Sequence, residues 1–72
     1  MAVLTGQARL RRIEQGRELQ RTMLEQELSY DAAAQLWGIK RNEVHNEIKG
    51  SNKPMRRVVK HWLAGHRRHD AD

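Results

Sequence analysis

Apolar residues recur along this chain at the spacing of helices, and no segment alternates apolar with polar residues as a half-buried strand does. The clearest stripe begins after Pro54. Its members are Met55, Val58, Val59, Trp62 and Leu63, which share one face of a helix. Proline suits the first turn of a helix and glycine its end. We therefore predict a helix that starts near Pro54 and ends at Gly65.

Two shorter helices are predicted upstream, over Tyr30–Trp37 and Arg41–Lys49. Ser29 is a good N-cap for the first helix, and glycines at positions 38 and 50 end the two segments. The second of these helices has few apolar anchors, namely Val44 and Ile48. A helix with so little apolar surface keeps one polar face available for a partner.

The N-terminal part predicts an amphipathic helix over Arg17–Leu28, because Leu19, Met23, Leu24 and Leu28 recur at helical spacing. Leu10 and Ile13 either extend this helix backwards or form a separate turn, and Gly16 favours a break before Arg17, since glycine costs about 1 kcal/mol in a helix interior. The predicted fold class is all-α, a small bundle of four to five helices. Its parts are a basic N-terminal arm or helix (1–16), a helix-turn-helix domain (17–65) and a disordered tail (66–72).

Composition limits the function. The 72 residues include no cysteine, which excludes disulfides and thiolate metal sites. No apolar run approaches the roughly 20 residues that span a bilayer, so no membrane partner is expected. A chain this short encloses little space for a substrate, and histidines 61, 66 and 69 form no rigid ligand set. We expect no enzyme, no cofactor and no metal, and a cytoplasmic protein in a bacterial or phage-infected host cell.

The charge distribution points to an anionic partner. Lys and Arg number 14 against 9 Asp and Glu, a net charge of +5. The excess is concentrated in residues 39–68, where the only acidic residues are Glu43 and Glu47. A basic region of this kind suits nucleic acid.

The stretch from Tyr30 to Gly50 has the spacing of a helix-turn-helix. Ala34, small enough for a close helix crossing, lies four residues before Gly38, which tolerates the positive φ of a tight turn. Val44, six residues after that glycine, anchors the second helix against the first.

This stretch resembles the helix-turn-helix of the Cro/cI-type (lambda-repressor-like) regulators common in phages. The residues that carry the resemblance are Ala34, Gly38, Ile39, Val44 and Ile48, which occupy that family's small, glycine and apolar positions. The following segment, Pro54–Leu63, resembles the family's next helix, so the likeness covers roughly residues 17–65. Tyr30 departs from the family's usual Gln and Lys40 from its usual Ser or Thr, and Asn42 is expected to cap the helix instead.

The resemblance implies a sequence-specific regulator of transcription, such as a repressor, whose second helix enters the major groove of double-stranded DNA. The side chains then expected to read bases are Arg41, Asn42, His45 and Asn46. Those expected to contact phosphates are Tyr30, Lys40, Lys49, Lys53, Arg56, Arg57 and Lys60. Arginine fits guanine and asparagine fits adenine through paired hydrogen bonds.

The N-terminal arginines leave alternatives open. Arg9, Arg11, Arg12 and Arg17 weakly resemble the arginine-rich RNA-binding motifs of phage antiterminators, and equally suit a minor-groove arm or a protein-docking helix. The alternative function is a small phage protein that binds host RNA polymerase to inhibit or antiterminate transcription. Glu43 and Glu47 on the predicted reading helix repel phosphate and favour this alternative. Surplus apolar residues in the N-terminal half suit a homodimer.

Overall fold

The computed structural model of the chain describes residues 5–50 and 53–66. Over these residues it is all-helical, as predicted, with four helices in chain order. They are α1 (Gly6–Glu25), α2 (Tyr30–Trp37), α3 (Arg41–Lys49) and α4 (Arg57–His66). Residues 1–4, 51–52 and 67–72 lie outside the described part, and with them most of the predicted tail.

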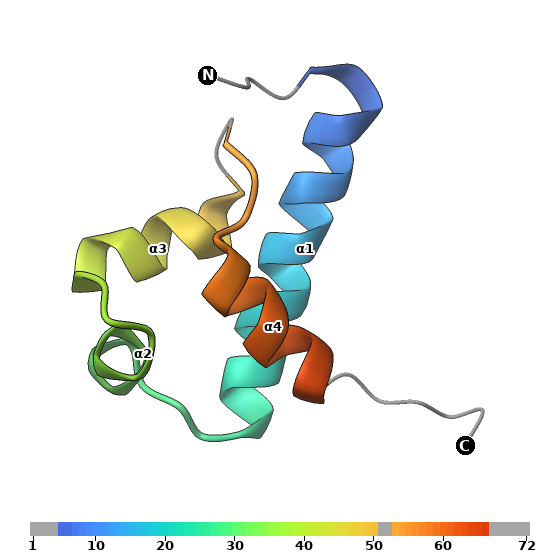
Figure 1. The fold of residues 1–72 in the computed structure, drawn as a ribbon. Helices are drawn as coiled ribbons and strands as arrows, with labels where there is room; N and C mark the ends of the chain where they lie inside the picture. The colour runs from blue at the N-terminus through green and yellow to red at the C-terminus, as the bar shows by residue number, and fades with distance from the viewer. Residues whose placement is uncertain (1–4, 51–52, 67–72) are drawn as a thin grey trace.

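The four helices form a flat bundle with principal extents of 34 × 31 × 16 Å. Figure 1 shows α1 along one edge, α4 crossing in front of it, and α2 and α3 on the other side. α3 is the central element, because it packs on both α1 and α2, whereas α4 packs on α1. The apolar core lies among these contacts. It consists of Leu19, Met23, Ala33, Ala34, Trp37, Val44, Met55, Val59 and Leu63.

The two short helices have the bounds that the sequence predicts, and the predicted residues form the start of α2 and the C-terminal ends of both helices. The Ser29 hydroxyl accepts a hydrogen bond from the Ala32 N–H at 3.1 Å, which caps α2. Gly38 and Gly50 end α2 and α3 in the left-handed region, with φ of 67° and 71°. Trp37 of the core is in edge contact with the partly buried Trp62, with ring centroids 5.6 Å apart.

The break favoured at Gly16 is wrong and the alternative, a helix extended backwards, is confirmed, because α1 continues through this residue without interruption from Gly6 to Glu25. Gly16 is buried where α1 crosses the end of α3. A Cβ at this position would overlap the carbonyl oxygen of Ile48 and lie 2.8 Å from its carbonyl carbon. The glycine therefore serves a close helix crossing, and the packing gained there outweighs its low helix propensity. Residues 6–16 are part of the folded bundle.

The predicted start of the last helix at Pro54 is also wrong, because α4 begins at Arg57. The residues before it are held in a non-helical course by other elements. The Lys53 carbonyl accepts a hydrogen bond from Arg12 of α1 at 3.0 Å, and the Arg56 N–H donates to Glu47 of α3 at 3.2 Å. Met55, between these two anchors, still reaches the core. Val58, which was expected in the apolar stripe, is 43% exposed.

Candidate nucleic-acid interface

One face of α3 packs inward and the opposite face is open. Val44 and Glu47 are buried, and Ile48 packs against the core. Residues about half a turn away lie on the other side of a helix with 3.6 residues per turn. That open face carries the side chains that were predicted to read bases: Arg41, Asn42, His45 and Asn46, all of them exposed, with Lys49 beside them.

Contacts with α2 support one side of this open face. The Tyr30 ring meets the His45 ring edge-on, with centroids 4.3 Å apart and planes at 86°. Asp31 pairs with Arg41 over 3.6 Å between Oδ1 and Nε, although both side chains are largely exposed and such pairs contribute little. Tyr30 itself is partly buried against the core. The first turn of α2 therefore holds the first half of α3 in place.

The other side of the face is supported by Glu43, which caps α3. Its carboxylate accepts the Lys40 N–H at 2.8 Å and the Arg56 Nη2–H at 2.9 Å. The prediction that Asn42 caps this helix is therefore wrong. A carboxylate at the third helical position reaches back to the N-cap amide, as in a capping box, and this leaves Asn42 pointing outward.

These contacts predict that the pKa of Glu43 is lowered, which can be measured. The hydrogen bond from the Lys40 amide lowers the pKa of Glu43, burial opposes it, and the positive charges of Arg56 and Lys40 lower the pKa further. Because the pKa of Glu43 is lower in the folded protein than in the unfolded chain, ionised Glu43 stabilises the fold. This contribution is complete above the unfolded-state pKa and is lost as the pH falls through the folded-state pKa. We expect Arg56→Ala to raise the Glu43 pKa in a carboxyl-detected NMR titration, and Arg57→Ala to leave it unchanged. Equal pKa values in the wild-type protein and Arg56→Ala would contradict this role of Arg56.

Beneath the face lies a buried ion pair between α1 and α3. Glu47 Oε1 accepts hydrogen bonds from Arg12 Nη2 and from the Arg56 N–H, each at 3.2 Å, and its Oε2 lies 3.4 Å from Arg56 Nε. Arg12 is 2% exposed. Burial lowers the pKa of Arg12, and the charge of Glu47 opposes this shift. The prediction that Arg12 belongs to an accessible RNA or partner arm is thus wrong, because its guanidinium joins α1 to α3 and to the Lys53 carbonyl.

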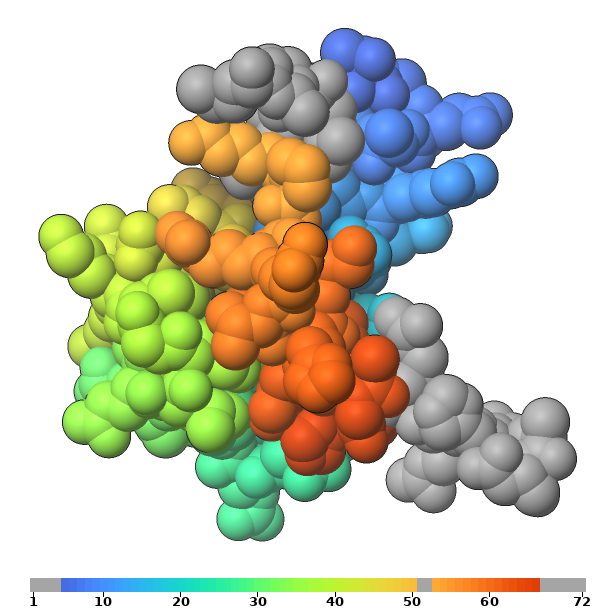
Figure 2. Space-filling model, in the orientation of Figure 1, coloured from blue at the N-terminus to red at the C-terminus, as the bar shows by residue number. Residues whose placement is uncertain are grey.

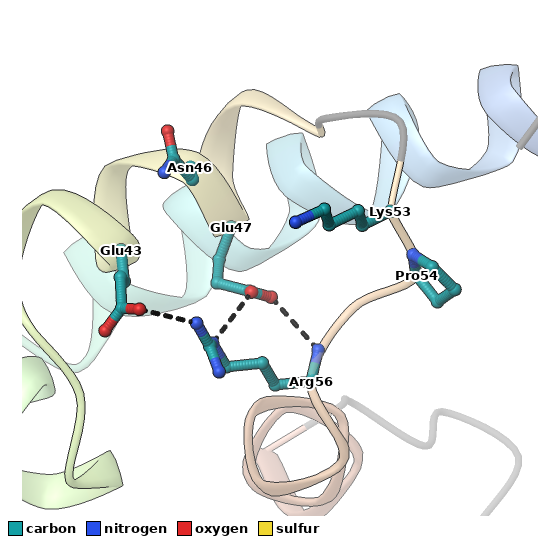
Figure 3. A pocket seen from close by; sticks show the side chains of 6 residues that line it. All are labelled: Glu43, Asn46, Glu47, Lys53, Pro54 and Arg56. Atoms are coloured by element: carbon teal, nitrogen blue, oxygen red, sulfur yellow. Dashed lines mark hydrogen bonds and ion pairs between the residues drawn. The ribbon is translucent and has the colours of Figure 1, made fainter. Parts of the chain in front are cut away.

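Figure 3 shows how the two carboxylates of α3 are oriented. Glu43 and Glu47 both turn towards Arg56, whereas Asn46 points away from them. The carboxylates that argued against phosphate binding are therefore each neutralised by an arginine. The hypothesis of RNA polymerase as partner stays a prediction, without this support.

An open hollow of about 520 Å³ lies between α3 and the segment that leads into α4. It is lined by Glu43, Asn46, Glu47, Lys53, Pro54 and Arg56 (Figure 3). The two carboxylates at its base are bound to arginines, and Lys53 extends across it. The hollow thus adjoins the open face of α3 and carries a cation at its side.

Of the cations that were expected to contact phosphates, Lys40, Lys49, Lys53, Arg57 and Lys60 are all exposed. Arg56 is also exposed, but its guanidinium is held by Glu43 and Glu47. Arg56 therefore links α3 to the segment before α4. The sequence analysis did not predict this role. On α1, Arg9, Arg11 and Arg17 are exposed, unlike Arg12.

No protein family, curated protein or solved structure that we compared with this chain matches it. Among the described helices, none combines the length and the apolar character needed to cross a bilayer. No group of three or more metal-binding side chains comes together in residues 5–50 and 53–66; His69 lies outside these ranges.

Proposed function

We propose that this protein is a sequence-specific DNA-binding regulator of transcription that places α3 in the major groove. The observation that carries the proposal is the composition of the open face of α3. It offers two asparagines, a histidine and the cations Lys40, Arg41 and Lys49, while the buried Glu47 is bound to Arg12 and the partly exposed Glu43 is bound to Arg56.

The dimensions of α3 suit a major groove. A helix with its side chains is about 10–12 Å wide, close to the groove width of about 12 Å. Asn42 and Asn46 are one turn apart on the exposed side, so both amides can approach base edges from one helix. Asparagine recognises adenine through paired hydrogen bonds, and each such pair contributes about 1–3 kcal/mol of discrimination. We therefore assign base recognition first to these two residues, with Arg41 beside them.

Cations next to α3 would hold the DNA backbone. Lys53 lies in the segment that follows α3, and Arg57 opens α4. Contacts of lysine or arginine with phosphates fix the position of a protein on the duplex but carry no sequence information. They also make binding salt-dependent, because each neutralised phosphate releases counterions.

Two variants separate base recognition from phosphate contact. A preferred duplex is first selected from a random pool at physiological salt, and its affinity is then measured by fluorescence anisotropy. We expect Asn46→Ala to reduce discrimination at one base pair by about 1–3 kcal/mol. Arg57→Ala should weaken binding to all sequences alike and reduce the slope of log K against log salt by about 1. Gln20→Ala, which removes an exposed amide from α1, is the matched control and should change neither quantity.

Two results would overturn the proposal. One is an Asn42→Ala, Asn46→Ala double variant that keeps the full sequence preference of the wild-type protein. The other is a selection that enriches no duplex, together with recovery of RNA polymerase by the protein from a nuclease-treated lysate. The second result would favour the polymerase-binding alternative.

A further inference from the structure

The outer face of α1 carries a regular stripe of exposed side chains. Its members are spaced four, three, four and three residues apart, and they are Leu10, Glu14, Arg17, Arg21 and Leu24. This spacing keeps side chains on one side of a helix, as in the seam of a coiled coil. The residues of α1 that are buried in the bundle, such as Leu19 and Met23, face the other way.

The bundle does not use this stripe. Leu10 is 63% exposed and Leu24 is 73% exposed, although both are large apolar side chains. Figure 1 shows α1 along one edge of the molecule, and Figure 2 shows the N-terminal half of α1 at that edge. Within residues 5–50 and 53–66, Glu14, Arg17 and Arg21 take part in no ion pair. Arg17 and Arg21, four residues apart, repel each other on the helix surface.

Reading the stripe from its C-terminal end gives nearly the same arrangement, except that the charges of Glu14 and Arg21 are exchanged. From either end it begins and ends with leucine, and Glu14 occupies the place that Arg21 occupies in the opposite direction. We propose that α1 pairs side by side and antiparallel with α1 of a second copy of this chain, about a two-fold axis at Arg17. Leu10 then lies level with Leu24 of the second copy, and Glu14 lies within one residue, about 1.5 Å along the helix axis, of its Arg21.

Charge decides the direction of the pairing. In the antiparallel arrangement, Glu14 meets Arg21 twice, once on each side of the axis. In a parallel arrangement, Glu14 would meet Glu14 and Arg21 would meet Arg21, so that every charged layer would be repulsive. Opposite charges at facing positions set partner choice and orientation in helix pairs. A two-fold axis also makes each contact occur twice, as in most homodimers.

The proposed dimer is a weak one. The stripe from Leu10 to Leu24 extends over about 21 Å of helix at 1.5 Å per residue. It offers only two leucine layers, so it falls in the class of small interfaces below about 1,200 Å². The two copies of Arg17 meet at the axis and repel, which further limits affinity. We therefore expect a dissociation constant on the order of 100 μM.

Sedimentation equilibrium over roughly 10 μM to 1 mM protein, without DNA, tests the proposal. We expect the wild-type protein to dimerise in this range and Glu14→Arg to weaken dimerisation about tenfold or more. The double variant Glu14→Arg, Arg21→Glu should restore the wild-type constant, because it only exchanges the two charges. Arg17→Leu should tighten the dimer about tenfold, since it replaces repulsion at the axis with an apolar layer. Leu36→Ser, which changes an exposed leucine of α2, is the control and should have no effect.

A wild-type protein that stays monomeric up to 1 mM would overturn the proposal. So would a dimer that Glu14→Arg leaves unchanged, or one that the double charge exchange fails to restore. All the substituted residues are exposed, so circular dichroism should show the same helix content in every variant. The experiment contains no DNA and changes no residue of α3, and its outcome is independent of the proposed DNA binding.

Discussion

Replacing Gly16 by alanine is expected to lower the free energy of unfolding by about 3 kcal/mol or more. The new methyl group would overlap the Ile48 carbonyl oxygen, which belongs to the backbone of α3 and cannot rotate away. The helices would have to separate, and the core contacts of α1 with α3 would loosen. Because small domains have only a few kcal/mol of stability, much of the protein should be unfolded at physiological temperature.

Gly65→Ala is the matched control for this substitution. Gly65 lies within α4, and no atom comes within 4 Å of the position that its Cβ would occupy. Alanine there should stabilise the protein by up to about 1 kcal/mol through its helix propensity. Thermal unfolding by circular dichroism should show a midpoint at least about 12 °C lower for Gly16→Ala, and equal or higher for Gly65→Ala. Similar midpoints for both variants would contradict the close crossing at Gly16.

The second large effect is expected from Arg12→Met, which should destabilise the protein by about 3 kcal/mol. Methionine fills most of the space but leaves the Glu47 carboxylate, with an 8% exposed side chain, without one of its two arginines. It also leaves the Lys53 carbonyl without its hydrogen bond from Arg12. Removing one member of a buried pair costs more than the pair contributes, because the remaining charge stays desolvated.

Arg11→Met provides the comparison, since Arg11 is exposed and its loss should change stability by less than about 0.5 kcal/mol. The double variant Arg12→Met, Glu47→Leu should recover part of the loss, because no buried charge is then left opposite the methionine. Urea unfolding of the four proteins measures all these effects. If Arg12→Met were as stable as Arg11→Met, the ion pair of Arg12 with Glu47 would not stabilise the fold. This result would contradict the structural role assigned to Arg12.

The central helices could be predicted from the sequence because local signals fix their ends. Ser29 before α2 caps the helix through its own side chain, and the glycines after α2 and α3 supply the left-handed residue that ends each helix. All these signals act within four residues of the helix end. They were sufficient for the bounds of α2 and α3.

The errors in α1 and α4 come from interactions between residues far apart in the chain. A glycine in a helix is unfavourable locally, and only the backbone of Ile48 explains why Gly16 lies inside α1. Arg12 looks like its exposed neighbour Arg11, and its buried partner Glu47 is 35 residues away. One signal was available: Arg12, Gly16, Leu19 and Met23 follow helical spacing, and this indicates one continuous buried stripe through the glycine.

The candidate interface was predicted in part. Helical spacing from Val44 and Ile48 suffices to place Asn42 and Asn46 on the open side of α3. The role of the two glutamates could not be predicted in this way, because it depends on Arg12 and Arg56, which come from other elements. Those arginines decide whether α3 presents a mixed or a cationic surface.

The most direct test of the account is a backbone amide NMR titration of the ¹⁵N-labelled protein with the duplex selected from a random pool. The account predicts that the largest shift changes fall on residues 40–49 and on the start of α4, and that residues 17–25 of α1 change little. Large changes centred on α1, with the amides of Asn42 and Asn46 unaffected, would contradict the claim that the open face of α3 recognises DNA.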